Sequence, residues 1–135
     1  MISRVPGAEL SKRIKQFQQL LKRHKIDLAL IRQNADMYYF AGTVQDAHLL
    51  IPDTGEPVML VWRVYDRAKA DSTLKHIYRL PSLRYLPELI KKHAFDKAAT
   101  VGLELDCMPA NMASWYSKKL WAQSNIVDIS LLYGR

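Results

Sequence analysis

Residues 47–62, AHLLIPDTGEPVMLVW, decide the fold class of this 135-residue chain. Two apolar runs, residues 47–51 and 58–62, flank a segment rich in Pro, Asp and Gly, which are the residue types of tight turns. The pattern predicts two antiparallel strands that are joined as a hairpin. Pro57 is compatible with the start of the second strand, because a residue at a strand end need not donate a hydrogen bond.

Helices and strands are predicted to alternate on both sides of this hairpin. The expected helices span residues 7–24, 34–40, 65–73, 83–93 and 110–121, and the further strands span 27–31, 76–80, 100–103 and 126–129. Asn34 is the expected N-cap of the second helix, and Gly42 is placed to end it. We therefore expect residues 1–135 to form a single α/β domain, in which helices flank a mixed β-sheet.

The composition is that of an ordinary globular protein, with 49% hydrophobic and 24% charged residues. A single cysteine, Cys107, excludes a disulfide framework and a cysteine-based zinc ribbon. No apolar stretch approaches the length of a membrane span, and the N-terminal sequence lacks the apolar region of a signal peptide. These features predict a cytoplasmic protein that does not enter membranes.

The positive charge is concentrated in the first helix. The net charge is +7, and residues 1–25 contain seven Lys and Arg residues against one acidic residue, so that segment carries +6. Leu10, Ile14, Phe17 and Leu21 are spaced as one apolar stripe, with the lysines on the opposite side. We interpret the basic side as a solvated helix face. The composition argues against binding of nucleic acid through this helix, because glutamines and not aromatic residues lie between the basic residues on this side.

Motifs that carry catalytic chemistry are missing from the sequence. It has neither a phosphate-binding loop nor a nucleophile elbow, and its four histidines lack the spacing of a metal pair on one helix. His48 is expected to be a packed residue of a strand. Glu104 and Asp106 could bind a metal or move protons, but we favour a polar loop with a capping Asp, since no third ligand is near in sequence. Cys107 is not expected to be a nucleophile.

Two aromatic clusters are candidates for contacts with a ligand or partner. Trp62 and Arg63 end a strand, and an Arg there can bind a carboxylate with two hydrogen bonds. We favour the simpler alternative, a core Trp beside a solvent-exposed Arg. Tyr38, Tyr39 and Phe40 are consecutive in a short helix, so at least one of them should face outward.

The order of the motifs resembles a known family. After the basic helix come IDLALI (residues 26–31), NADMYYFAGT (34–43), LLIPDTGEPVMLV (49–61) and TVGLELD (100–106). This succession is similar to the N-terminal domain of the creatinase/prolidase/aminopeptidase P group, the pita-bread metallopeptidases. The resemblance covers nearly the whole chain and implies the ribonuclease H-like layers of that domain.

The resemblance implies a non-catalytic role for this chain. In the family, a following catalytic domain supplies two Asp, one His and two Glu that bind two divalent metals, typically Mn, Co or Zn. None of these ligands, and no catalytic residue, maps onto residues 1–135. The expected partners are the chain's own C-terminal catalytic domain, a second copy in a homodimer, and a short proline-containing peptide as the parent's substrate.

Candidate substrate contacts also follow from the resemblance. Family members place substrate-facing residues after the hairpin, which points to Trp62 and Arg63 first and to Tyr38 and Tyr39 second. In this interpretation the domain narrows the mouth of the active site of an Xaa-Pro dipeptidase or aminopeptidase P. The alternatives are a stand-alone or fused protein-binding module of the same fold and, as the least favoured, a nucleic-acid binder.

Overall fold

The computed structural model describes residues 4–133, which alternate between helices and strands as the sequence predicts. The helices are α1 (Gly7–Arg23), α2 (Asn34–Ala41), α3 (Tyr65–Asp71), α4 (Leu86–Lys92) and α5 (Ala110–Lys119), with short 3₁₀ helices η1 (Leu83–Tyr85) and η2 (Ser130–Tyr133). The strands are β1 (Leu28–Ile31), β2 (Ala47–Pro52), β3 (Val58–Val61), β4 (His76–Arg79), β5 (Thr100–Leu103) and β6 (Asn125–Asp128). The expected elements are therefore all present, with ends that differ by up to a few residues.

Within the described residues the strands form one six-stranded sheet in the order β4-β3-β2-β1-β5-β6. β2 and β3 form the predicted antiparallel hairpin, in which Leu49 lies opposite Met59. β2 is also antiparallel to β1, whereas β1 with β5, β5 with β6 and β3 with β4 pair in parallel. The mixed sheet predicted from the hairpin is thus confirmed.

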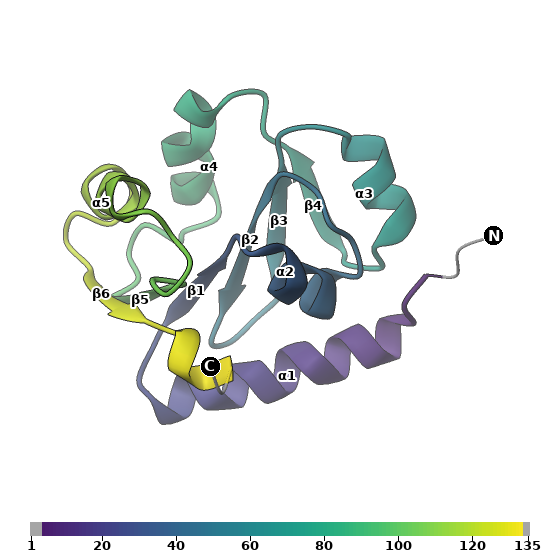
Figure 1. The fold of residues 1–135 in the computed structure, drawn as a ribbon, viewed down its shortest axis with the longest axis horizontal. Helices are drawn as coiled ribbons and strands as arrows, with labels where there is room; N and C mark the ends of the chain where they lie inside the picture. The colour runs from purple at the N-terminus through teal and green to yellow at the C-terminus, as the bar shows by residue number, and fades with distance from the viewer. Residues whose placement is uncertain (1–3, 134–135) are drawn as a thin grey trace.

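Side chains that alternate along the strands supply a core on each face of the sheet. From β1, Ala29 and Ile31 belong to the core under α1, α2 and α3. Leu28 and Leu30, on the opposite face, belong to the core under α4 and α5. In Figure 1, α4 and α5 lie together on the left, away from α3, and α1 runs along the lower side. The inner strands β1 and β3 read as continuous apolar runs because both of their faces are covered.

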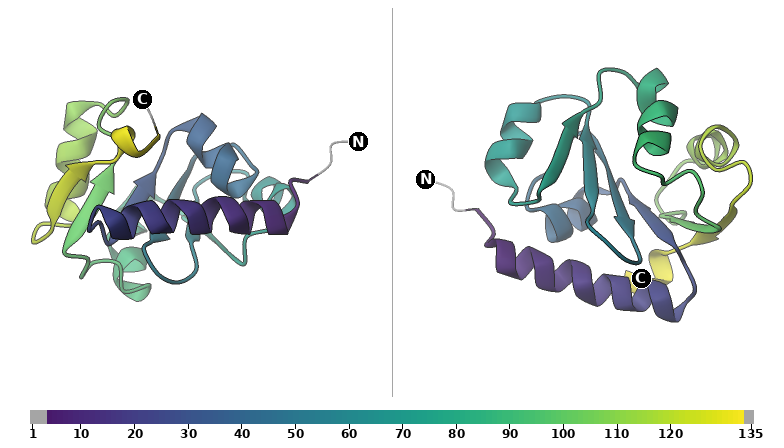
Figure 2. Two further views of the ribbon diagram at one scale, coloured as in Figure 1. Left: turned by 90° about the horizontal axis from the view of Figure 1, so that it is seen from below. Right: turned by 180° about the vertical axis from the view of Figure 1, so that it is seen from behind.

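The long helix α1 packs through the predicted apolar stripe. Leu10, Ile14, Phe17 and Leu21 are each at most 5% exposed. Burial of each such side chain contributes about 1.5–3 kcal/mol. Viewed from below in Figure 2, α1 lies in front of the strands along much of the molecule. The stripe places the lysines of α1 in solvent, as we expected.

Two local predictions need correction. The N-cap of α2 is Gln33, not Asn34, and its side-chain oxygen accepts a hydrogen bond from the backbone N–H of Asp36 at 2.9 Å. The predicted helix over residues 83–93 begins instead as η1, and α4 starts at Leu86. Its second residue is Pro87, which lacks the N–H of a helix interior and is tolerated only in the first turn.

Glycines are required at two positions, one that ends a helix and one where two segments pack closely. Gly42 ends α2 in the left-handed conformation with a φ of 76°, as predicted. At Gly102 in β5 an added Cβ would collide with the side chain of Ile129. The segment that follows β6 can therefore pack tightly on β5. Of the helices in residues 4–133, none has both the length and the apolar character needed to cross a membrane.

Candidate functional site

The candidate site lies along the edge of the sheet where its parallel strands end. β1, β3, β4, β5 and β6 all point the same way, so their carboxyl ends meet at one edge, which we call the carboxyl edge. The residues that follow β1, β3 and β5 there are Arg32, Trp62 and Glu104. Ligands of open α/β sheets bind at this edge, where neighbouring strands lead to opposite faces. β1 and β5 are such a pair, because β1 leads to α2 and β5 leads to α5.

The Arg32 side chain connects the end of β1 to the start of β2. Its guanidinium donates to the carbonyl oxygen of Ala47 at 2.6 Å and to the Asp46 carboxylate at 3.2 Å. The Asp46 carbonyl in turn accepts a hydrogen bond from the N–H of Trp62 at 3.0 Å. A chain of contacts therefore runs along the carboxyl edge from β1 to the end of β3.

Glu104 is a buried carboxyl group that connects β5 to α2. It is 1% exposed, and it accepts hydrogen bonds from the backbone N–H groups of Arg32 at 2.6 Å and Gln33 at 2.9 Å. A hydrogen bond also joins its side chain to that of Asp36 in the first turn of α2. Burial, and after it the hydrogen bond with Asp36, raise the pKa of Glu104 from 4.5 to about 8. At neutral pH the Glu104 carboxyl group therefore keeps its proton.

The sequence interpretation of residues 104–106 is only partly right. Asp106 is exposed, as expected for a polar loop, but Glu104 is buried. The predicted capping Asp is also wrong, because α5 has Pro109 at its N-cap position and no side-chain cap. The burial of Glu104 depends on N–H donors about 70 residues earlier in the chain, for which the local sequence holds no signal.

A cavity of about 200 Å³ lies beside Glu104, between the ends of β1 and β5. Arg32, Cys107 and Met112 are among its lining residues. Among residues 4–133, no group of three or more His, Cys, Asp and Glu side chains is placed to bind a metal ion. The groups at this cavity can hold a proton and accept or donate hydrogen bonds.

His48 is a packed residue of β2, which confirms the prediction from sequence. It is 3% exposed, and its Nε2 lies 2.7 Å from the hydroxyl of Tyr116 in α5. Burial, and next the positive charge of Arg32, lower the pKa of His48 to about 3. The imidazole is therefore neutral at physiological pH and connects the sheet to α5.

Trp62 and Arg63 form an exposed pair at the end of β3. The Trp62 side chain is 46% exposed, so the alternative of a core Trp is wrong. The Arg63 guanidinium lies over the Trp62 ring, 4.4 Å from its centroid. Stacking of this kind restrains a long side chain while its hydrogen-bond donors stay free for a ligand.

The backbone directly after this pair is strained. Val64 adopts the left-handed conformation, with φ 56° and ψ 44°, and its side chain is 61% exposed. A β-branched residue is rarely found there, and such strain costs on the order of 1–3 kcal/mol. The Val64 carbonyl begins α3 by accepting from the N–H groups of Arg67 and Ala68. The turn therefore holds Trp62 and Arg63 between the rigid end of a strand and the start of a helix.

Tyr38 and Tyr39 both face outward from α2, at 49% and 47% exposure, whereas Phe40 is buried. The Arg13 guanidinium of α1 lies 4.6 Å from the centroid of the Tyr39 ring and donates to the Tyr39 carbonyl at 2.8 Å. Tyr39 also lines a cavity of about 470 Å³ with Phe17 and Tyr133. The two predicted pairs therefore lie on different elements, with Trp62 and Arg63 after β3 and the tyrosines on α2.

Comparisons with known proteins identify what this architecture is similar to. The family model of the creatinase/prolidase N-terminal domain matches residues 13–134. Among solved structures, the Creatine_N superfamily domain of a dipeptidase from Streptococcus thermophilus has a TM-score of 0.76 at 13% identity, over 90% of this chain and 96% of that one. The N-terminal domain of an X-Pro dipeptidase from Streptococcus pyogenes has a TM-score of 0.75 at 16% identity, over 92% and 98% of the chains.

Prolidase from Pyrococcus furiosus is similar over only part of its length. It has a TM-score of 0.72 at 18% identity, over 91% of this chain but 36% of that one. No curated protein sequence matches the chain. At these identities the structures establish the fold, and the match to the family model over most of the chain establishes its family.

Proposed function

This chain belongs to the creatinase/prolidase N-terminal domain family, and from that premise we propose that it is the non-catalytic N-terminal half of an Xaa-Pro dipeptidase or aminopeptidase P. In that role it packs on a C-terminal catalytic domain, contributes to a homodimer and narrows the mouth of the active site. The catalytic domain binds the two divalent metals, Mn, Co or Zn, through two Asp, one His and two Glu of its own. We extend the proposal to a cytoplasmic location, which the use of a single cysteine supports.

The observation that carries this proposal is the exposed stack of Arg63 on Trp62, held at the strained turn of Val64. Exposed Trp and Arg residues are enriched where proteins contact ligands and partners. Arg63 is suited to bind the terminal carboxylate of a short peptide, because a guanidinium can donate two parallel hydrogen bonds to it. Trp62 offers a flat apolar surface beside that charge, on which a proline ring can pack.

Further exposed apolar side chains support a surface for the catalytic domain or the second copy. Tyr38 in α2 is 49% exposed, and Val44, three residues after the end of α2, is 45% exposed. Val44 precedes Asp46, whose carbonyl oxygen binds the N–H of Trp62. Apolar side chains in solvent near a stacked Arg and Trp are typical of surfaces that become covered on assembly.

Kinetics of the full-length parent enzyme test the role of Arg63. Arg63→Ala should raise KM for an Xaa-Pro dipeptide about tenfold with little change in kcat, since one charge-assisted contact to bound substrate is lost. Arg84→Ala is the matched control, because the Arg84 guanidinium also stacks on an exposed ring, that of Tyr85, at 5.0 Å. An unchanged KM for Arg63→Ala, or an equal rise for both variants, would remove Arg63 from the site.

The coding sequence beyond residue 135 tests the proposed class of enzyme. Two Asp, one His and two Glu in the order of the family's metal ligands would support a dinuclear metallopeptidase. Replacement of these ligands, or a stop codon after residue 135, would contradict the peptidase proposal. The chain would then be a protein-binding module of the same fold.

A further inference from the structure

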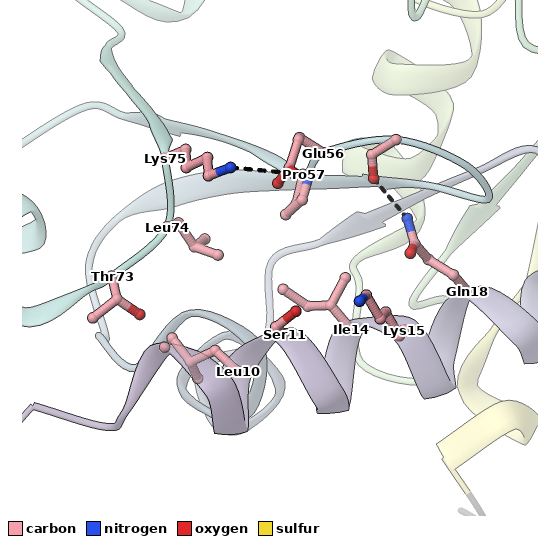
Figure 3. A pocket seen from close by; sticks show the side chains of 12 residues that line it. Leu10, Ser11, Ile14, Lys15, Gln18, Glu56, Pro57, Thr73, Leu74 and Lys75 are labelled. Carbon is pink, nitrogen blue, oxygen red and sulfur yellow. Dashed lines mark hydrogen bonds and ion pairs between the residues drawn. The ribbon is translucent and has the colours of Figure 1, made fainter.

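A groove of about 310 Å³ separates α1 from the turn of the β2–β3 hairpin and from the segment between α3 and β4. Its floor is apolar. Figure 3 shows Leu10 and Ile14 on the side of α1, and Pro57 and Leu74 on the opposite side. A groove of this size is at the small end of the range that accepts a ligand or a few side chains.

Polar contacts hold the walls of the groove in place. The Gln18 side-chain amide donates to the carbonyl oxygens of Pro52 at 2.8 Å and Gly55 at 2.9 Å, which fixes the hairpin turn over α1. On the opposite wall, the ammonium group of Lys75 lies 3.9 Å from the Glu56 carboxylate. Figure 3 shows the contact between Lys75 and Glu56 and that between Gln18 and Gly55 of the hairpin turn. The apolar floor is therefore formed before any partner arrives.

The α1 side of the groove is positively charged. Ser11, Lys15 and Gln18 line the groove. Lys22 lies four residues farther along α1, on the same helix face. Lys15 and Lys22 are exposed, as are Lys12 and Arg23 farther around the helix. In the part of the chain that the structure describes, none of these four cations forms an ion pair. Their charge is thus available to a partner.

The chemistry of the groove distinguishes between classes of anionic partner. A membrane surface would require a free apolar helix face, but the apolar stripe of α1 is buried in the core. A single-stranded nucleic acid would require exposed aromatic rings for its bases, and the solvent face of α1 has Lys, Arg and Gln instead. A polypeptide can present both acidic and aliphatic side chains, which matches the lysines of α1 beside an apolar floor.

We propose that this groove binds a segment of a partner protein that combines acidic side chains with one or two aliphatic ones. An aliphatic side chain enters between Ile14 and Leu74, and acidic side chains pair with Lys15 and Lys22. The site is separate from Trp62 and Arg63, so the two proposals can be tested independently and failure of one does not affect the other.

Fluorescence anisotropy with a labelled hexapeptide, EELLEE, tests the proposal on the 135-residue chain at low ionic strength. Binding should weaken about tenfold in the double variant Lys15→Glu/Lys22→Glu, because two attractions become repulsions. The double variant Lys118→Glu/Lys119→Glu on α5 has the same net charge and alters exposed lysines of the other face. It should bind the peptide as the unmodified chain does.

The contribution of the apolar floor is tested separately. Ser11→Phe should fill the groove and weaken EELLEE binding, and the peptide EEEEEE should bind at least tenfold more weakly than EELLEE. Absence of EELLEE binding, equal binding of both peptides, or equal loss in the α5 control would each overturn the proposal. Stronger binding of a single-stranded DNA oligonucleotide than of EELLEE would overturn it in favour of a nucleic acid.

Discussion

α1 and the carboxyl edge of the sheet differ in which kind of group they bury and which they expose to solvent. α1 buries a stripe of apolar side chains and leaves its basic groups in water. The carboxyl edge buries the carboxyl group of Glu104 and leaves the ring of Trp62 half exposed. The first arrangement lowers the free energy of the fold. The second costs free energy locally, as expected at a site where function constrains the structure.

The largest expected effect is the loss of packing under α1. Phe17 is 4% exposed and stacks on Tyr133 with ring centroids 5.6 Å apart. Phe17→Ala should lower the free energy of unfolding by about 3–5 kcal/mol, measured by urea denaturation. Trp62→Ala should lower it by less, about 1 kcal/mol, because that residue is already 46% exposed in the folded chain. If the two losses were equal, the contrast between the regions would be wrong.

The next effect concerns the proton of Glu104, whose side chain is hydrogen-bonded to Asp36. The pKa of Glu104 is raised in the folded chain, so folding favours its protonated form. The protonated Glu104 makes its full contribution to the free energy of unfolding below pH 4.5. This contribution is lost as the pH rises to about 8, where Glu104 ionises in the folded chain. The loss should be on the order of 3 kcal/mol. It can be measured as the free energy of unfolding at a series of pH values.

Glu104→Gln should remove this pH dependence. The amide can still accept from the backbone N–H groups of Arg32 and Gln33, and its NH₂ group can donate a hydrogen bond to the Asp36 side chain. Near pH 9 this variant should therefore be more stable than the unmodified chain. Asp106→Asn is the control at an exposed acid two residues away, and it should keep the original pH dependence. A pH dependence that survives Glu104→Gln would assign the proton elsewhere.

A smaller effect is expected on self-association of the isolated chain. If the apolar surface near Trp62 is normally covered, the chain should associate reversibly at high concentration in sedimentation experiments. Trp62→Glu should weaken that association about tenfold, because a charge would have to be desolvated in the contact. A strictly monomeric chain would count against a large covered surface at the carboxyl edge.

The smallest effect tests the strain at Val64. Glycine adopts the left-handed conformation freely, so Val64→Gly should raise the free energy of unfolding by about 0.5–1 kcal/mol despite its greater backbone entropy. In the full-length parent the same change should raise KM, because the turn that presents Arg63 becomes less rigid. A clear loss of stability in thermal unfolding would show that the valine side chain contributes more than the strain costs.

Local patterns were sufficient to predict most of the fold. The hairpin follows from turn residues between two apolar runs, and the stripe of α1 follows from helical periodicity, so neither depends on distant contacts. The cap of α2 was misplaced because Gln33 and Asn34 are adjacent and both have an amide side chain that can cap. Only the backbone conformation decides between them.

The candidate site was less predictable because its geometry comes from contacts between distant segments. Trp62 and Arg63 were identified as residue types, but their stacking and the turn at Val64 are properties of the fold. Glu104 was recognised as a candidate acid, yet its burial depends on N–H groups of the segment after β1. The local sequence resembles a surface loop, so it predicted Glu104 in solvent, whereas the fold buries this side chain.

The strand order has a consequence for how copies of this chain avoid aggregation. The outermost strands are β4 and β6, and each has only four residues. Charged or polar groups stand at their ends, with Arg79 closing β4 and Asp128 closing β6. Short, charged borders are poor templates for another strand, because pairing would bury their charges. Continuation of the sheet from one molecule into the next is therefore disfavoured.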